Sequence, residues 1–426
     1  MRVTLIGHAS LLFETRGGVL LMDPVFFDPF EEGAVGSCPA RQVDVEKLPD
    51  IDYLVVSHRH PDHFDIPSLA RTSRDCQVLC PSDPLVLYAL GQLGFPRVVP
   101  VEPRQLLSTA DLQLFSTRSE ERAVREFGLV VADGSGTVWN QVDTILSAST
   151  IGEVVARFGT ADLLFARYAS QNFEFFESRA TTFPYEEHQR NLETVLAIRP
   201  RAVVPGSAGF KFVGDHAWLN RYLFPASEER FIADLNRLDS AIHPVPLRPG
   251  DVVEVKGAGV EVRRNASPFC RMIRDDTAEL RFDPTAFIPP LRDPNPGDDT
   301  EEEMVRTIAG CLEGLHHYAT ENFGRRLTLA DRYRRARAVY EVAVVLPNGT
   351  RRWQIDFRPD PPTLEAEGTA EANGVHWIAA SALTDWAMRR RSYFYTRAYS
   401  RRFSILYRLW GDEAGVEVRP SRSPIS

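Results

Sequence analysis

Four side chains able to bind a metal ion fall within six consecutive positions: His58, His60, Asp62 and His63. Imidazole and carboxylate groups are ligands that suit zinc, iron and manganese. The apolar run 53–56 before them predicts a short buried strand, and Pro61 restricts how the chain continues. The sequence therefore predicts a loop at the end of a strand that presents a metal site. The alternative is a histidine-rich turn in solvent, which seldom gathers so many ligand types.

Three further polar residues follow predicted strands or occupy a turn between them. Asp23 follows an apolar strand expected at 18–22, and Asp143 follows a hairpin expected at 127–140. His8 lies in a glycine-containing turn between two strands of alternating pattern. We expect Asp23 to orient a ligand imidazole through its N–H group. His8 is expected either to do the same or to be a structural histidine.

The elements that must position these residues come in two rounds of strands followed by helices. This order predicts an α/β fold in which two sheets pack face to face with helices outside them, an αββα sandwich. A length of 426 residues favours two domains. We place the first at residues 1–265 and a C-terminal α+β domain at residues 266–426. The segment 26–41 is rich in Phe, Gly and Pro without a period, and we expect it to be a loop over one edge of the site.

The C-terminal domain is expected to begin with an irregular linker at 266–299, where prolines gather. Thr300 and Glu303 have the spacing of a capping box, which predicts a helix over 301–322. The remaining expected elements are strands over 337–346 and 350–357 joined at Asn348-Gly349, and helices over 377–389 and 392–409.

Composition excludes some classes of function. The formal net charge of −9 argues against a nucleic-acid-binding protein. No apolar run is long enough to span a bilayer, and the N-terminus enters a strand pattern rather than a signal-peptide pattern. Five cysteines, an odd number without a CxxC pair, favour free thiols in a reducing compartment. We therefore expect a cytoplasmic protein.

The first domain resembles the metallo-β-lactamase-fold family. The stretch His58-Arg59-His60-Pro61-Asp62-His63 has the family's HxHxDH motif in full. The resemblance implies that the first two histidines bind one metal ion and that the Asp-His pair binds a second. It also implies that Asp143 bridges the two ions. The alternative for Asp143 is the N-cap of the following helix.

Two departures from the hydrolases of this family resemble its minority branch of diiron oxygenases. This branch includes the chloramphenicol-pathway β-hydroxylase, CMP-N-acetylneuraminate hydroxylase and the platensimycin–platencin diterpenoid hydroxylase. The loop that carries a third histidine in hydrolases offers Glu121 or Glu120 here. Where hydrolases place a last histidine, this chain has Gly206-Ser207-Ala208-Gly209. The resemblance implies that His216 binds the second metal, with Ser207 as a weak substitute; otherwise His216 is a surface residue.

The resemblance implies a nonheme diiron monooxygenase that uses O2 to hydroxylate an aliphatic carbon in natural-product or antibiotic biosynthesis. A carboxylate in place of a histidine suits iron better than a zinc-bound hydroxide nucleophile. The implied substrate is a small molecule, such as an acyl-CoA, a carrier-protein thioester or a CoA-tethered diterpenoid acid. Electrons must come from an external donor. The alternatives are a dinuclear zinc hydrolase of an ester, thioester or phosphodiester, and a metal-bearing protein that binds without turnover.

Two aromatic segments have no assigned chemistry. The run 173–176 is expected either to line an apolar substrate pocket or to pack in the core. The helix expected at 392–409 carries several arginines among aromatic residues, and it would cover an apolar, anionic substrate. A solvated helix face or a homodimer contact explains that helix more simply.

Overall fold

The computed structural model describes residues 1–172, 175, 181–257, 259–321 and 329–401. Contacts divide the chain into two compact units. The first comprises Met1–Gln171 and Phe183–Pro284, and the second comprises Asn172–Thr182 and Thr285–Ser426. No helix of the described segments has the length and apolar character needed to cross a bilayer.

Two sheets form the framework of the first unit. Among the described residues, the first sheet has the strand order β18-β17-β1-β2-β3-β6-β7-β8. Its strands are β1 Arg2–Gly7, β2 Ser10–Thr15, β3 Gly18–Met22, β6 Tyr53–Val55, β7 Gln77–Pro81, β8 Val98–Val101, β17 Val252–Lys256 and β18 Gly259–Arg263. From β3 to β8 the neighbouring strands are parallel, so their carboxyl ends meet at one edge.

The second sheet has the order β16-β14-β13-β12-β11-β10-β9 in the described segments. Its strands are β9 Leu106–Ser108, β10 Gln113–Arg118, β11 Phe127–Asp133, β12 Gly136–Asn140, β13 Leu163–Arg167, β14 Ala202–Gly206 and β16 His243–Pro244. The predicted hairpin is present as β11 and β12, and β12, β13 and β14 run parallel.

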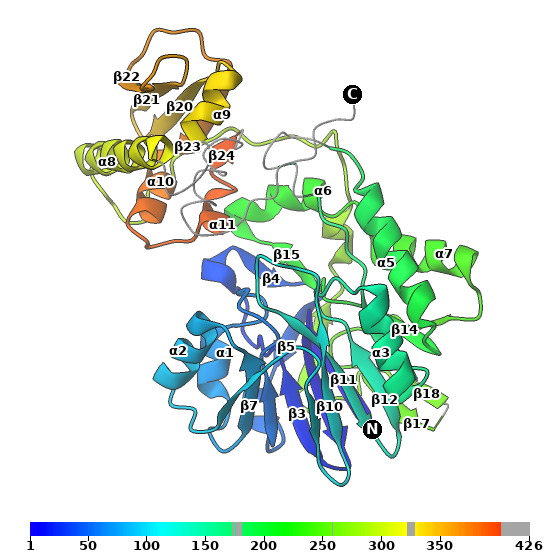
Figure 1. The fold of residues 1–426 in the computed structure, drawn as a ribbon. Coiled ribbons are helices and arrows are strands. Elements are labelled where there is room, and N and C mark those ends of the chain that lie inside the picture. Colours follow the sequence, from blue (N-terminus) through cyan, green and yellow to red (C-terminus); the bar gives the residue numbers. More distant parts are fainter. Residues whose placement is uncertain (173–174, 176–180, 258, 322–328, 402–426) are drawn as a thin grey trace. The chain divides into compact units, whose positions relative to one another are not determined.

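Alternating side chains explain the layers. Leu11 and Phe13 of β2 enter the core between the two sheets, whereas Leu12 between them enters the core under the first pair of helices. Figure 1 shows α1 and α2 on the side of β7, and α3 and α5 on the side of β12 and β14. The helices of this unit are α1 Ile66–Arg71, α2 Pro84–Gln92, α3 Ala148–Phe158, α5 Tyr185–Ile198, α6 Asn220–Leu223 and α7 Glu228–Leu238. The predicted αββα sandwich is confirmed.

Two segments predicted as irregular contain short strands. Within 26–41, β4 Val35–Ser37 pairs with β15 Phe210–Phe212. β5 Ala40–Val43 pairs with β19 Cys270–Arg274, which lies inside the expected linker 266–299. The 3-10 helix Thr277–Leu280 follows, so the first unit continues to Pro284 rather than ending near residue 265. These strands pair with distant segments, and local periodicity carries no sign of that.

The second unit contains a sheet of order β22-β21-β20-β23-β24 in its described residues. Its elements are α8 Glu301–Thr320, α9 Leu329–Arg335, β20 Val339–Leu346, β21 Gly349–Asp356, β22 Thr363–Ala366, β23 Gly374–Ala379, α10 Ala380–Ala387, α11 Tyr393–Thr396 and β24 Ser400–Arg401. Met304, Ile308 and Leu312 of α8 are fully buried in the same cluster as β20.

The helix predicted over 377–389 is wrong at its start, because β23 pairs in parallel with β20 and the helix begins only at Ala380. The helix predicted over 392–409 is interrupted in its described part. There α11 ends at Thr396 and β24 pairs with β23. Residues 402–409 of that prediction lie outside the described residues, as do 173, 174 and 176 of the aromatic run.

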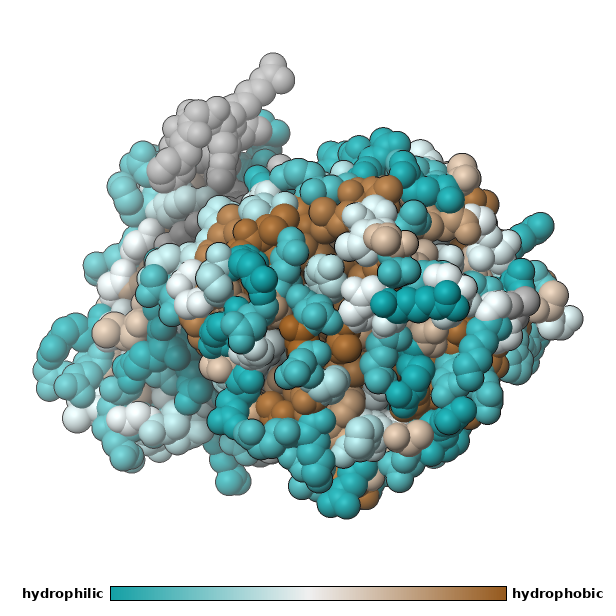
Figure 2. All heavy atoms as spheres, turned by 90° about the horizontal axis from the view of Figure 1, so that it is seen from below, coloured by the Kyte–Doolittle hydropathy of each residue, from teal (hydrophilic) through white to brown (hydrophobic). Residues whose placement is uncertain are grey.

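Hydrophilic side chains cover much of the face seen in Figure 2, and apolar ones lie between them. Large apolar residues that are exposed, such as Leu85, Tyr88 and Phe287, come from separate parts of the chain. Scattered apolar residues of this kind are ordinary on a protein surface.

The capping box of α8 generates a stability prediction. The Thr300 hydroxyl accepts the Glu303 N–H at 3.3 Å, and the Glu303 carboxylate accepts the Thr300 N–H at 3.0 Å. Thr300→Ala should therefore destabilise the helix end by about 1 kcal/mol. Hydrogen exchange of the first-turn amides of α8 measures this. Glu302→Ala is the control, because its exposed ion pair with Arg306 is worth only a few tenths of a kcal/mol. Equal exchange in the two variants would contradict the assignment.

Candidate metal centre

The histidine loop leaves the carboxyl end of β6 and enters α1. His63 and Phe64 both donate their N–H groups to the His60 carbonyl, at 2.9 and 2.8 Å. Asp65 then caps α1 by accepting the Ser68 N–H at 3.0 Å. This compact turn brings the side chains of a short segment to one point at the sheet edge.

Asp23 directly follows β3 and fixes the conformation of this loop through hydrogen bonds. Its carboxylate is fully buried and accepts the Ser57 N–H at 2.7 Å and the Ser57 hydroxyl at 2.6 Å. Its Oδ2 lies 2.9 Å from Nδ1 of His63. Because the carboxylate accepts the Nδ1 proton, Nε2 of His63 is left with its lone pair for a metal.

His58, His60 and Asp143 form the first group of ligand atoms, which lie within 4.8 Å of one another. Nε2 of His58 lies 2.8 Å from Nδ1 of His60 and 3.8 Å from Oδ2 of Asp143. Nδ1 of His58 is 2.9 Å from the Ser57 hydroxyl oxygen, whose own proton goes to Asp23. That oxygen accepts the His58 Nδ1 proton, so Nε2 faces the group as a ligand.

A strained turn after β12 presents Asp143. Val142 before it has φ of 56°, an unfavourable conformation for a β-branched residue. The Val142 N–H is held by Asn140 Oδ1 at 3.1 Å, and the Thr144 hydroxyl donates to the Gln141 carbonyl at 2.6 Å. Asp143 is not an N-cap, because α3 begins later, with Ser147 as its cap.

His8, Asp62 and His63 form the second group. Nε2 of His8 lies 3.1 Å from Oδ2 of Asp62, and Nε2 of His63 lies 3.4 Å from Oδ2 of Asp143. Both ring nitrogens are buried, and within the described residues neither meets the geometry of a well-aligned hydrogen bond, although each faces a carboxylate oxygen. Buried nitrogens that face carboxylates without bonding to them are what a shared metal ion would explain.

The charges at most of these groups also fit a metal. His63 is the exception in the metal-free protein: burial lowers its pKa, but Asp143 and Asp62 outweigh burial and raise it, so a bound metal ion would displace the Nε2 proton. Burial lowers the pKa of His58, helped by His63 and His60, and burial lowers the pKa of His60. Both rings are therefore neutral at physiological pH, as a metal ligand must be. Burial opposes ionisation of Asp62 and Asp143, but neighbouring histidines outweigh it and lower the pKa of both carboxyls. The residues present therefore fit two metal ions side by side, with Asp143 facing both groups.

The 118–122 loop carries the predicted carboxylate ligand, Glu121 or Glu120. Neither group of described ligand atoms includes Glu121 or Glu120. Oε1 of Glu121 accepts the N–H groups of Arg122 and Ala123 at 2.7 and 2.9 Å, and Glu120 is paired at 3.9 Å with Arg118. The Glu121 carboxylate thus stabilises its own turn.

Glu126 is the acidic residue that sequence reasoning missed. It is 9% exposed, and its carboxylate accepts the Ser119 hydroxyl at 2.5 Å. Burial raises its pKa to about 7, and the nearby charge of Asp143 contributes in the same direction. The next residue, Phe127, donates its N–H to the Ser57 carbonyl at 3.4 Å beside the histidine loop. In the sequence, the only sign of its importance is its position directly before the hairpin predicted at 127–140.

The predicted ligand His216 also lies outside both described groups. It is buried in the 3-10 helix Gly214–Leu219, where its N–H donates to the Val213 carbonyl at 3.1 Å. His8, predicted to orient a ligand, occupies the second group instead. Gly209 makes this placement feasible, because a Cβ atom at position 209 would lie only 2.7 Å from the backbone nitrogen of His8.

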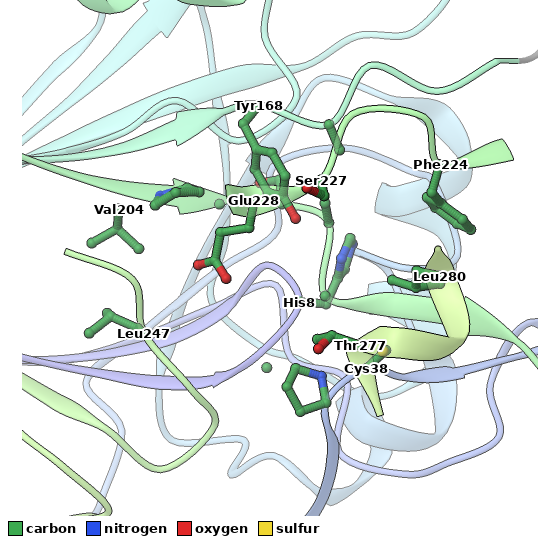
Figure 3. Close-up of a pocket in the computed structure, with 18 of the residues that line it drawn as sticks. His8, Cys38, Tyr168, Val204, Phe224, Ser227, Glu228, Leu247, Thr277 and Leu280 are labelled. Carbon is green, nitrogen blue, oxygen red and sulfur yellow. The ribbon is translucent and has the colours of Figure 1, made fainter. Parts of the chain in front are cut away.

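A cavity of about 510 Å³ adjoins the second group in the first unit. His8 and Cys38 line it on one side, Ser207 after β14 contributes to its wall, and Tyr168 and Glu228 point into it in Figure 3. The structure therefore places Ser207, the predicted weak substitute ligand, at the wall of the cavity. The cavity has the size of a typical small-molecule site.

Comparison with known proteins identifies the class of domain. Residues 20–205 match the family described as the beta-lactamase superfamily domain. The chain therefore contains a beta-lactamase superfamily domain, and the first unit has the metallo-β-lactamase fold, as the histidine motif predicted.

Curated relatives match the chain over part of their length. A protein of Mycolicibacterium smegmatis that is named as a Rieske 2Fe-2S iron–sulfur protein is 33% identical over 160 residues, 34% of this chain and 30% of that protein. The 3-hydroxylase of 4-amino-L-phenylalanyl-CmlP peptidyl-carrier protein from Streptomyces venezuelae is 28% identical over 174 residues, 38% of this chain and 32% of that protein. The chain thus spans about a third of the length of these relatives. The second of them bears out the predicted resemblance to a hydroxylase.

Solved structures with a similar arrangement include both oxidative and hydrolytic enzymes. The diiron β-hydroxylase CmlA from Streptomyces venezuelae has a TM-score of 0.42 at 19% identity, covering 62% of this chain and 54% of its own. An isothiocyanate hydrolase from Delia radicum gut bacteria has a TM-score of 0.46 at 15% identity, covering 60% of this chain and 100% of its own.

Removal of the Asp23 charge should weaken metal binding. Asp23→Asn loses the acceptor that fixes the His63 tautomer and holds Ser57, so metal affinity should fall about 10- to 100-fold. Competition with a chromophoric chelator measures this. Asp44→Asn, at an exposed carboxylate that pairs with Lys47, is the control. Unchanged affinity in a folded Asp23→Asn protein would show that the carboxylate does not orient the ligand.

Gly209→Ala should affect the second group selectively. The added methyl group would force His8 away from Asp62, so the number of bound metal ions should fall from about two to about one per chain. Elemental analysis of the purified protein checks the count. Gly152→Ala in α3, where the new methyl group meets open space, should retain both ions. Two tightly bound ions in Gly209→Ala would contradict the expected displacement of His8 by the methyl group.

Proposed function

We propose that the chain is a nonheme diiron hydroxylase that oxidises an aliphatic carbon of a small-molecule intermediate. The observation that carries the proposal is the composition of the two ligand groups, each of which has two imidazoles and one carboxylate. Two histidines and one carboxylate bind a single nonheme iron ion in oxygenases, and each of the two groups would hold one such ion. The sequence similarity to a carrier-protein-dependent hydroxylase supports the same chemistry.

The chain's own residues orient and shield the centre. Iron ions held there would supply the activation of O2 for hydroxylation. Asp23 fixes His63 through Nδ1, Ser57 fixes His58, and the buried environment of both rings excludes water from the ligand atoms. The cavity beside His8 provides room for substrate next to the second group. Electrons for the reaction come from an external donor.

The substrate class follows from the similarity and from the cavity. The curated hydroxylase is named for a substrate tethered to a peptidyl-carrier protein. We infer an acyl group carried as a thioester on coenzyme A or a carrier protein, in a natural-product pathway of the cytoplasm. A diterpenoid acid is one acyl group of this kind. The second unit would act as a substrate cover or as the contact in a homodimer.

A dinuclear zinc hydrolase is the second candidate. Two observations favour it. The Glu121 carboxylate, whose presence as a ligand would suit iron, is engaged in its own turn. In addition, an N-acyl-phosphatidylethanolamine-hydrolyzing phospholipase D of Caenorhabditis elegans is 36% identical over 72 residues, 16% of this chain and 20% of that protein. Two histidines and one carboxylate also occur at catalytic zinc sites.

Metal content and turnover separate the two functions. The protein purified from iron-supplemented cells should hold about two iron ions per chain. With a reductant and O2, it should hydroxylate the acyl group of a carrier-protein or CoA thioester. His58→Ala should lower the rate at least about 100-fold, because it removes a ligand of the first group. His317→Ala, at an exposed histidine of α8, should have the rate of the unmodified chain. Zinc alone, with hydrolysis of esters or thioesters and no oxygen consumption, would reverse the assignment.

A further inference from the structure

The cavity of the first unit has a polar end that the metal centre does not explain. Tyr168, which follows β13, and Glu228, the first residue of α7, point into the same space in Figure 3. His8 lines the cavity and also belongs to the second ligand group. A molecule bound to the polar end would therefore extend toward the metal centre.

Glu228 has one oxygen available for a ligand. Its side chain is 15% exposed, and Oε2 accepts the Arg248 Nη1–H at 2.8 Å. Within the described part of the chain, Oε1 has no hydrogen-bond partner, and neither has the Tyr168 hydroxyl. The free carboxylate oxygen of Glu228 and the Tyr168 hydroxyl both face the cavity, and each can accept a hydrogen bond from a ligand.

The local charge favours a cation at this end. Glu229 lies beside Glu228 in the first turn of α7, and burial, partly offset by Arg248, raises the pKa of Glu228. Arg248 is already engaged by Glu228 and, at 3.7 Å, by Asp275. The other guanidinium of the lining belongs to Arg281, an exposed residue. In keeping with excess negative potential, burial and then Glu228 and Glu229 raise the pKa of Tyr168.

Large apolar side chains make up much of the remaining wall. Val204 and Leu247 are buried on one side, and Phe224 and Leu280 lie on the other in Figure 3. A ligand for this cavity therefore combines a positively charged head with an apolar body. The polar end of the cavity would compensate the head for its lost hydration, and the apolar wall would bury the body.

We propose that the cavity binds a primary amine, with the ammonium group donating to Glu228 and Tyr168 and the apolar body lying along the wall toward His8. As an assignment of substrate class, this rests on the proposed function: the acyl group of the thioester would then carry an amine, which a diterpenoid acid lacks. The binding site itself depends only on the cavity and can be tested without turnover.

Isothermal titration of the full chain with phenethylamine and with its neutral counterpart 2-phenylethanol tests the proposal. Phenethylamine should bind at least about tenfold more tightly than the alcohol. Glu228→Gln should remove that preference while the affinity for the alcohol stays within about twofold. Tyr168→Phe should weaken amine binding by a smaller factor, because it removes one neutral acceptor. Glu193→Gln, an exposed carboxylate of α5 outside the cavity, is the control and should bind as the unmodified chain does.

The dependence on Glu228 distinguishes binding in the cavity from coordination of the amine to a metal, which would not require this carboxylate. Equal affinity for amine and alcohol would overturn the proposal. It would also be overturned by unchanged amine binding in a Glu228→Gln protein with an unaltered melting temperature, or by no saturable amine binding up to about 10 mM. A chain that binds the amine but holds zinc and does not hydroxylate would retain this site and lose the proposed oxidative function. The two failures are therefore separable.

Discussion

A single buried carboxylate connects the fold to the metal centre. Asp23 has no solvent exposure, and its oxygens accept from Ser57 twice and meet Nδ1 of His63. Its backbone N–H donates to the Val55 carbonyl at 2.9 Å, so the end of β3 and the end of β6 are joined by backbone and side chain together. A buried charge is tolerated only when it is paired and hydrogen-bonded. Asp23 therefore requires the histidine loop in this conformation as much as the loop requires Asp23.

Parallel strands explain why the ligands meet. β3 and β6 are parallel neighbours in the first sheet, and β12 begins the parallel half of the second sheet. The carboxyl ends of such strands lie at the same edge, where loops can vary without disturbing the core. The histidine loop and the Asp143 turn come from different sheets, and close packing of the shared core places them against each other. Geometry at the centre thus depends on the whole sandwich rather than on the motif alone.

Among the described residues, the second ligand group takes an imidazole from the β1–β2 turn and none from the loop after β14. After β14 the chain continues with glycine, serine and alanine, and those residues line the cavity instead of reaching the centre. The β1–β2 turn supplies His8, and Gly209 leaves the space that the His8 backbone needs. The small residues after β14 thereby leave space for the His8 side of the β1–β2 turn and for the cavity beside it.

The sequence by itself determined the ligand types in the histidine loop, the order of strands and helices in the first unit, and the capping box of α8. Each of these is local: a spacing of a few residues or an apolar period records it directly. Only the tertiary structure decided that His8 joins Asp62 and His63, that Glu121 turns back on its own loop, and that Glu126 is buried beside the centre. It also decided that β4, β5 and β19 form from segments without periodicity, because their hydrogen-bond partners lie far away along the chain. Contacts between distant segments depend on how the sheets pack, and no local pattern of residues carries that information.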